Sequence, residues 1–200
     1  MPTLLQITSS LSGLSSASSE LAARFANSWR DNHPGGRVIV RDLAEEPAPH
    51  LTAEAFAAFR KPAGVRTARE QLAAAYSDAL IDELQQADVL ALGLPMYNFG
   101  VPSTLKAWMD HVARAGVTFR YTANGPEGLL RGKQAYVFAT RGGRYAGTAR
   151  DTQTPFVRDF LGFLGIEAVE FVYAEGLAMG DEPRATALQS ADARIHQLAA

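Results

Sequence analysis

The 200-residue chain contains no cysteine. This absence excludes disulfide bridges, thiol catalysis and thiolate metal sites. Only four histidines are present, and they are scattered without metal-ligand spacing, so a zinc site is not expected. We expect these histidines, including His111, to be solvated helix residues rather than catalytic acids. Any oxidation–reduction chemistry must therefore come from a cofactor.

The sequence also lacks a strong charge bias and long apolar runs. Its 19 Lys and Arg residues nearly balance 21 Asp and Glu residues, giving a net charge of −2. No electrostatic surface for nucleic acid or an anionic membrane is expected. No apolar run approaches ~18 residues, and residues 1–7 lack the basic and apolar regions of a signal peptide. We expect a cytoplasmic protein with a small-molecule partner.

The chain does contain enough apolar residues, 47% of the total, for one buried core. Without an internal repeat, linker or low-complexity tail, we expect residues 1–200 to form a single domain. Short apolar runs alternate with segments of helical periodicity, which predicts an α/β fold with a parallel sheet between helical layers. The predicted strands are residues 4–7, 37–42, 89–94, 134–139 and 168–173.

Helices are predicted between these strands. One carries apolar residues from Leu21 to Trp29, another begins near Pro102, and a third closes at Gly165. Residues 116–130 are predicted to be an irregular excursion between the second and third of these. Further helices are predicted at residues 53–59, 68–87 and 183–200, with Leu72, Tyr76, Ala79, Leu80 and Leu84 on the buried face of the helix at 68–87.

Three loops that follow predicted strands have the composition of ligand-binding loops. After the first strand, residues 8–19 are rich in serine, and residues 1–23 contain no Lys or Arg. Free N–H groups at a helix N-terminus favour an anion, but a polyphosphate would lack the cationic clamp of a P-loop. A single phosphate fits this loop better. Simple capping of the helix by a serine is the alternative.

The loop after the third strand offers a sulfur, two aromatic rings and an amide. These belong to Met96, Tyr97, Asn98 and Phe99. Ligands in open α/β sheets bind beyond the carboxyl ends of the strands, and this composition suits a flat ring with polar edges. The alternative is a tight strand-to-helix connection whose aromatic residues belong to the core.

The loop after the fourth strand brings Gly142 and Gly143 directly to the strand end, where backbone can approach a ligand closely. A plain turn is the alternative. In the flavodoxin-like strand order 2-1-3-4-5, the three loop-bearing strands are neighbours, so one crevice can hold all three loops. A monophosphate, a flat ring and a polar ring edge are the parts of FMN.

Seven short segments match motifs of one known family. They are residues 9–10, 16–18, 95–99, 102–110, 116–121, 125–130 and 140–143. Together they resemble the FMN-dependent NADH:quinone oxidoreductases and NADH-azoreductases, which are flavodoxin-like quinone reductases. The resemblance implies a flavodoxin-like three-layer sandwich, with a five-stranded parallel sheet of order 2-1-3-4-5 and helices on both faces.

Carried over position by position, the resemblance implies one FMN per subunit. Thr140 stands where a serine is common in the family, and it keeps the hydroxyl. The implied FMN contacts come from Ser10, Ser16, Ala17, Ser18, Met96, Tyr97, Asn98, Phe99, Thr140, Arg141, Gly142 and Gly143.

The implied activity is the transfer of two electrons from NADH or NADPH to quinones and aromatic azo compounds. Donor and acceptor would use one place in turn, which gives ping-pong kinetics. Backbone N–H groups at Asn98, Phe99, Gly142 and Gly143 are the expected stabilisers of the reduced flavin. Phe99 and Tyr121 are expected to line the substrate space.

The resemblance also implies a homodimer whose substrate pockets use both subunits. Apolar and aromatic residues from Trp108 to Leu130 are expected to leave an exposed apolar patch that a second copy covers, with Phe119 and Tyr121 as wall residues. Two other functional classes share this fold. A flavodoxin-type electron-transfer protein would show a strongly acidic face, and a flavin-free regulatory or structural dimer would carry no chemistry.

Overall fold

A computed structural model of the protein describes residues 1–199. Its parallel strands are β1 (Thr3–Thr8), β2 (Arg37–Asp42), β3 (Val89–Pro95), β6 (Gln134–Thr140) and β7 (Ala168–Ala174). Its main helices are α1 (Ala17–Asn32), α2 (Ala53–Arg60), α3 (Ala68–Gln86), α4 (Ser103–Val112), α5 (Gln153–Leu164) and α6 (Asp181–Leu198). Every predicted strand is present, with ends that differ by at most one residue.

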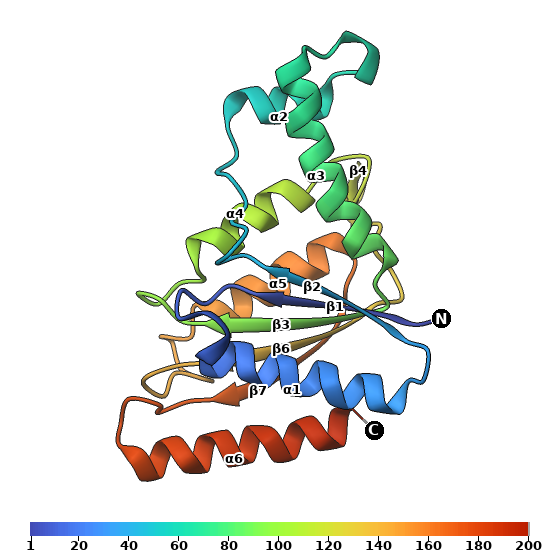
Figure 1. The fold of residues 1–200 in the computed structure, drawn as a ribbon. Helices are drawn as coiled ribbons and strands as arrows, with labels where there is room; N and C mark the ends of the chain where they lie inside the picture. Colours follow the sequence, from blue (N-terminus) through green and yellow to red (C-terminus); the bar gives the residue numbers. More distant parts are fainter. Residues whose placement is uncertain (200) are drawn as a thin grey trace.

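The five strands form one parallel sheet in the order β2-β1-β3-β6-β7. This is the predicted order 2-1-3-4-5, with labels shifted because a small hairpin intervenes. Figure 1 shows α1 and α6 below the sheet and α3, α4 and α5 above it. The predicted flavodoxin-like sandwich is therefore confirmed.

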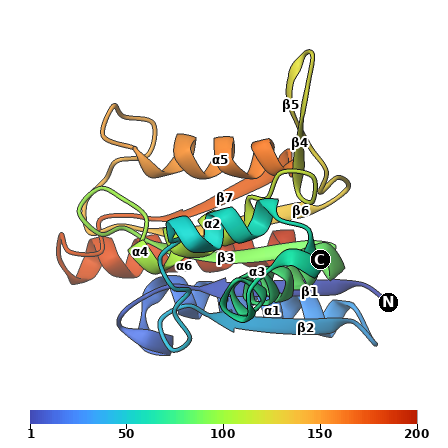
Figure 2. The same cartoon turned by 90° about the horizontal axis from the view of Figure 1, so that it is seen from above.

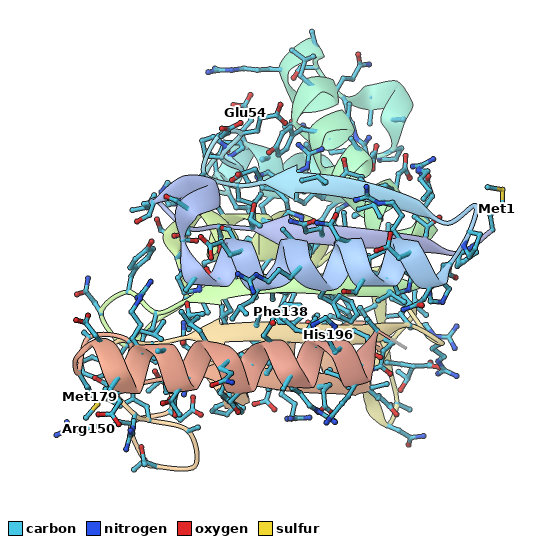
Figure 3. All side chains as sticks on the ribbon, turned by 60° about the horizontal axis from the view of Figure 1, so that its bottom comes forward. Met1, Glu54, Phe138, Arg150, Met179 and His196 are labelled. Atoms are coloured by element: carbon cyan, nitrogen blue, oxygen red, sulfur yellow. The ribbon has the colours of Figure 1, made fainter. Side chains whose placement is uncertain are left out.

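Alternate residues of each strand face opposite helical layers. Leu4 and Phe138 pack with α1 and α6, whereas Leu5 and Val137 pack with the helices on the other face. Figure 3 shows Phe138 on the face that α1 and α6 cover. Because both faces of the sheet are buried at its centre, the central strands read as nearly continuous apolar runs rather than alternating ones.

The buried face of α3 is only partly the predicted one. Leu80 and Leu84 lie in the core, but Leu72 is 73% exposed and Ala79 is also exposed. Figure 1 shows the reason, because the first half of α3 extends beyond the sheet and meets α2 there. Without a sheet beneath it, the start of the helix leaves Leu72 exposed, whereas Tyr76 further along packs against the core.

The segment predicted to be irregular forms an antiparallel hairpin of β4 (Phe119–Thr122) and β5 (Gly125–Gly128). The expected exposed apolar patch from Trp108 to Leu130 is wrong. Trp108 is 2% exposed on the inner side of α4, and the Phe119 ring packs on Phe163 with centroids 4.2 Å apart. Tyr121, at 75%, is the large aromatic side chain of this segment that stays exposed.

His111 was expected to be solvated and is instead 2% exposed. Its Nε2 lies 2.9 Å from the carbonyl oxygen of Pro49, so this nitrogen carries the proton and donates. The buried Nδ1 has no hydrogen-bond partner within residues 1–199. Burial lowers the pKa of His111 below its usual 6.5, because it outweighs the Pro49 bond and the charge of Asp110.

This lowered pKa makes folding stability depend on pH. The unfolded chain takes up a proton at His111 near pH 6.5, and the folded chain resists it until lower pH, so stability falls as pH drops below about 7. The free energy of unfolding should change with pH by up to ~1.4 kcal/mol per pH unit because of His111, and we expect His111→Gln to remove this contribution. Urea unfolding from pH 5.5 to 7.5 measures it, with exposed His196→Gln as the control. Equal slopes in wild type and His111→Gln would contradict the assignment.

Candidate functional site

The carboxyl ends of β1, β3 and β6 lie at one end of the sheet, on the left in Figure 1. The three predicted loops meet there. The Tyr97 hydroxyl lies 3.1 Å from Ser10 Oγ and accepts a bond from the Leu11 N–H at 3.0 Å. Met96 N–H donates to the Thr140 carbonyl at 3.2 Å. Direct hydrogen bonds therefore join all three loops.

The serine loop leads into the N-terminus of α1. Ser16 is the N-cap, and its Oγ accepts the Ser19 N–H at 3.2 Å and donates to Ser19 Oγ at 2.9 Å. The capping interpretation thus holds for the side chain of Ser16. The N–H groups of Ala17 and Ser18 have no acceptor within residues 1–199, so the helix start still offers two donors.

Gly93 brings this helix start onto the sheet. A Cβ at Gly93 would lie only 2.9 Å from the Ser18 carbonyl oxygen, so a larger residue would push α1 away from β3. A glycine inside a buried strand often marks such a close backbone approach. The glycine within the apolar run of residues 89–94 is the sequence signal for this contact.

Residues 97–100 form a tight turn with two left-handed residues. Tyr97 and Gly100 exchange N–H···O bonds of 3.1 and 2.9 Å, while Asn98 and Phe99 have φ angles of 50° and 64°. Positive φ at both central positions defines a type I′ turn, which favours Asn-Gly. Asparagine tolerates this conformation, but for phenylalanine it carries a conformational energy cost on the order of 1–3 kcal/mol. Burial of the side chain does not compensate for this backbone strain, because Phe99 is 49% exposed.

Buried Gln153, at the start of α5, holds this turn in place. Its Nε2 donates to the carbonyls of Pro95 at 2.9 Å and Gly100 at 3.0 Å. The neighbouring Thr152 hydroxyl donates to the Phe99 carbonyl. These contacts span more than fifty residues of sequence, so no local pattern could have identified Gln153.

A cleft of about 630 Å³ lies between the turn and the start of α4. This size falls in the range of small-molecule and cofactor sites. Thr104 Oγ1 is buried beside it without a hydrogen-bond partner in the part of the chain that the structure describes. The lining residues are Leu11, Met96, Tyr97, Asn98, Val101, Pro102, Ser103 and Thr104.

The Gly142-Gly143 loop lies beside this cleft without lining it, and its carbonyls point toward the segment after β7. The carbonyls of Arg141, Gly142 and Gly143 accept bonds of 3.1, 3.0 and 2.8 Å from the turn at residues 176–178. In a trans peptide the N–H points opposite to the C=O, so the N–H groups of Gly142 and Gly143 point away from that turn. Neither has an acceptor among the described residues.

Arg141 and Thr140 occupy different environments. The Arg141 side chain is fully buried, and its two terminal nitrogens bind Asp151, Thr154 and Glu175. Its backbone N–H and C=O are also bonded within the protein, so the structure does not support the expected direct ligand contact. Thr140 lies opposite Pro95 at the end of β6, beside Met96.

Tyr121 is not brought to this cleft within one chain. Its hairpin packs at the far end of α5, where Leu130 N–H donates to the Leu164 carbonyl at 2.8 Å. Gln153, which holds the cleft turn, is at the other end of that helix, roughly 18 Å away at 1.5 Å per residue. Figures 1 and 2 both show the hairpin at the end opposite to the three loops.

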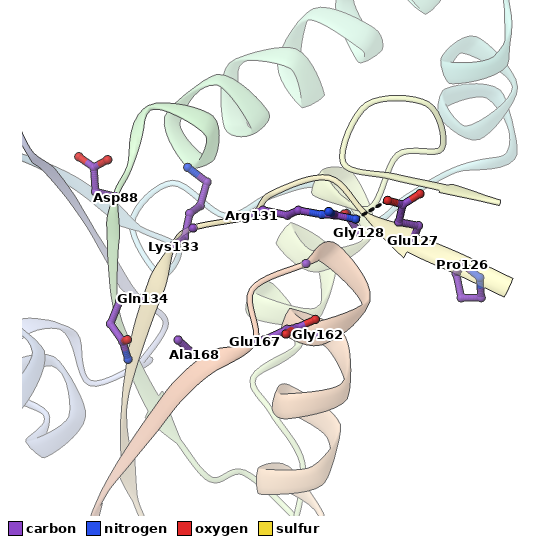
Figure 4. A pocket seen from close by; sticks show the side chains of 12 residues that line it. Asp88, Pro126, Glu127, Gly128, Arg131, Lys133, Gln134, Gly162, Glu167 and Ala168 are labelled. Carbon is purple, nitrogen blue, oxygen red and sulfur yellow. Dashed lines mark hydrogen bonds and ion pairs between the residues drawn. The ribbon is translucent and has the colours of Figure 1, made fainter. Parts of the chain in front are cut away.

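A larger hollow of about 770 Å³, shown in Figure 4, lies where β3, β6 and β7 begin. Several of its charged groups are engaged within the protein: Arg131 pairs with Glu127, and Lys133 donates to the Gln85 carbonyl. Ligands of open α/β sheets bind at the carboxyl ends of strands. The smaller cleft at that end is therefore the candidate site.

Two features are absent from residues 1–199. No cluster of three or more His, Asp or Glu side chains is arranged to hold a metal ion. Nor does any helix in this range combine the length and apolar character required to span a membrane.

Comparisons with known proteins agree with this geometry. A model of the Flavodoxin_2 family, described as a flavodoxin-like fold, matches residues 2–199. The chain is 52% identical over 187 residues to an FMN-dependent NADH:quinone oxidoreductase of Cellvibrio japonicus, covering 94% of each. It is 49% identical over 199 residues to a second such protein from Pseudomonas fluorescens, covering 100% of each.

A similar solved structure is that of an FMN-dependent NADH-azoreductase from Bacillus anthracis in complex with FMN. It is 26% identical to this chain, with a TM-score of 0.90. The alignment covers 100% of this chain and 98% of the other. The likeness therefore extends over the whole sandwich and its loops.

The role of Gln153 can be tested by Gln153→Leu, which keeps the volume and removes both hydrogen bonds. Two carbonyls would lose their donor, and we expect a loss of about 2–3 kcal/mol in the free energy of unfolding. Urea denaturation measures this, with exposed Gln189→Leu as the control. A change no larger than that of the control would show that Gln153 does not hold the turn.

Proposed function

The chain belongs to the Flavodoxin_2 family, and we propose that it is an FMN-dependent oxidoreductase that carries two electrons from NADH or NADPH to quinones and aromatic azo compounds. The observation that carries this proposal is the meeting of three loops at one cleft. The relatives at about 50% identity support it, since they are named FMN-dependent NADH:quinone oxidoreductases. The azoreductase from Bacillus anthracis supports the azo substrate class.

The residues present fit the parts of FMN. The N–H groups of Ala17 and Ser18, with the hydroxyl of Ser10 nearby in the loop, suit a phosphate at a helix N-terminus. Because residues 1–23 contain no cation, one phosphate fits better than the two of FAD. The turn at residues 96–99 would hold the ring, and the N–H groups of Gly142 and Gly143 would meet its polar edge.

When bound, FMN supplies hydride chemistry between the nicotinamide donor and the acceptor. The protein groups orient the ring and stabilise charge. Fixed N–H donors at Gly142 and Gly143 lower the energy of negative charge at the ring edge, as an oxyanion hole does. Phe99 and Tyr145, whose ring centroids are 5.6 Å apart, form one wall beside the ring. Donor and acceptor use the same space in turn, so the kinetics are ping-pong.

A flavodoxin-type electron-transfer protein is the alternative function. Such carriers usually present a strongly acidic face, whereas this chain has a net charge of −2. A flavin-free regulatory protein would have no use for a strained aromatic turn beside free N–H groups. Both observations favour the enzyme.

Two measurements test the function. We expect the purified protein to retain FMN, identified by mass spectrometry of the released flavin. With NADH varied against benzoquinone, double-reciprocal plots should give parallel lines, because one cleft serves both substrates. Recovery of FAD, or no flavin after reconstitution, would contradict the cofactor assignment. Intersecting lines would indicate separate sites for donor and acceptor.

We also propose that the protein acts as a homodimer with shared pockets. Tyr121 is exposed and lies far from the cleft of its own chain, so in this proposal it would contribute to the cleft of a second copy. Phe56, Val65 and Leu72, on and near the projecting α2 and α3, are exposed apolar side chains that a partner would cover. Phe119 was the other residue expected to line the shared pocket, but it is buried within its own chain and is left out of this proposal.

Mixing two variants tests the shared pocket. If each site combines Phe99 of one chain with Tyr121 of the other, Phe99→Ala and Tyr121→Ala homodimers are both impaired. A heterodimer of the two restores one complete site, so coexpression should recover about a quarter of wild-type activity. Light scattering should give about twice the 21.5 kDa of one chain. Activity no higher than the mean of the parents would count against the shared site.

The matched control coexpresses Tyr121→Ala with a chain that carries both changes, since no complete site can then form.

We further propose that residues 1–200 act as one domain, because the five-stranded sheet takes strands from Thr3 through to Ala174. The cytoplasm is the proposed location, since NADH and NADPH are available there.

A further inference from the structure

One buried guanidinium ties together the loop beside the cleft. Arg141 directly follows β6, and its side chain is 0% exposed. It donates to Asp151 at 2.7 Å, at the far end of the loop, and to Glu175 at 3.0 Å, directly after β7. A single cation thus fixes both ends of the loop and the end of the neighbouring strand.

Glu175 also binds the loop directly. Its carboxylate accepts the N–H groups of Tyr145 at 2.8 Å and Ala146 at 3.0 Å. Hydrogen bonds to a charged acceptor are roughly twice as strong as neutral ones. The next residues, 176–178, donate to the carbonyls of residues 141–143. The short segment from Glu175 to Ala178 therefore holds the loop at three carbonyls and two N–H groups.

These contacts decide which N–H groups remain for a ligand. Tyr145 and Ala146 turn their N–H groups to Glu175, while Gly142 and Gly143 turn theirs the opposite way. Since β6 lies between β7 and β3, that opposite direction is the β3 side, where the cleft lies. The Tyr145 ring meets Phe99 on this side.

We propose that Glu175, held by Arg141, is a positioning residue that aims the Gly142 and Gly143 N–H groups at the ring edge of bound FMN and so favours its reduced form. This inference rests on the proposed function. It assigns to Glu175 a role that no motif of the sequence suggested, since the residue lies outside all three predicted loops.

The network allows Glu175 to be changed without stranding a buried charge. Asp151 still pairs with Arg141 at 2.7 Å and receives two bonds from Thr154. Burial opposes ionisation of Asp151, but the bonds from Arg141 and Thr154 outweigh it and lower the pKa of this carboxyl. Asp151 therefore remains a carboxylate that neutralises Arg141 when Glu175 is replaced.

The test compares Glu175→Ala, Glu175→Gln and Glu170→Gln. Glutamine keeps an oxygen that can accept the Tyr145 and Ala146 N–H groups, so it should rescue much of the defect. Glu170 is a matched control, because it is a carboxylate on β7 that pairs with Arg194 at the surface. Three quantities are measured: the FMN dissociation constant, the midpoint potential of bound FMN, and trypsin cleavage of the ligand-free protein after Arg144 and Arg150.

For Glu175→Ala we expect FMN to bind about tenfold more weakly, about the weight of one ordinary hydrogen bond. The midpoint potential should become more negative, because misdirected N–H donors stabilise reduced flavin less. Trypsin should cut the loop faster, and Figure 3 shows Arg150 at its outer end. Glu175→Gln should lie between Glu175→Ala and wild type, and Glu170→Gln should match wild type.

A wild-type dissociation constant and potential in Glu175→Ala would overturn the inference, even if overall stability fell. Equal shifts in Glu170→Gln would overturn it as well, because the effect would then be general to β7. If wild-type protein bound no FMN, the proposed function would fail. Trypsin cleavage would then still decide whether Glu175 orders the loop.

Discussion

All five strands of a parallel sheet end at the same edge, and the backbone beyond that edge loses its ladder partners. In this chain, hydrogen bonds between the loops and the neighbouring strands replace those ladder partners. Leu43 N–H donates to the Thr8 carbonyl, Met96 N–H to the Thr140 carbonyl, and Arg141 N–H to the Ala174 carbonyl. Each loop is thus fixed by the strand beside it. The few N–H groups left without acceptors lie where a ligand can use them, because buried donors are otherwise almost always paired.

The loops that fix this edge of the sheet contain two locally destabilising features, and both lie beside the cleft. Phe99 holds a left-handed conformation that phenylalanine disfavours, and Arg141 is a fully buried charge. Neither arrangement is the most stable choice locally, since glycine would relieve the first, and apolar residues in place of the whole Arg141–Asp151–Glu175 group would avoid the second. Strain and buried charge of this kind persist at functional sites, where geometry matters more than stability. The two features lie on adjacent loops, which supports treating the cleft as a single site.

The sequence predicted what depends on local pattern. Short apolar runs marked all five strands, and the ends of those strands located the three loops. The strand order came instead from the flavodoxin-like fold, and that order brings the three loops together. The same reasoning failed where distant contacts decide. Nothing near Gln153 or Glu175 indicates that they hold residues 95–100 and 145–146, and nothing near His111 indicates that the Pro49 carbonyl accepts a hydrogen bond from it. Trp108 and Phe119 were placed at the surface because their burial depends on α4 and α5 packing over the sheet.

The lining of the cleft suggests how one site can serve different acceptors. None of its eight lining residues is charged, and Phe99 beside it is exposed rather than enclosed. A site of this kind holds flat molecules by stacking and apolar contact, and it does not demand a particular hydrogen-bond pattern from them. The groups with fixed direction are the N–H donors of Gly142 and Gly143, which would face the cofactor in the proposed function. In that function the protein would set the energy of the ring edge closely and leave the choice of acceptor to shape and reducibility.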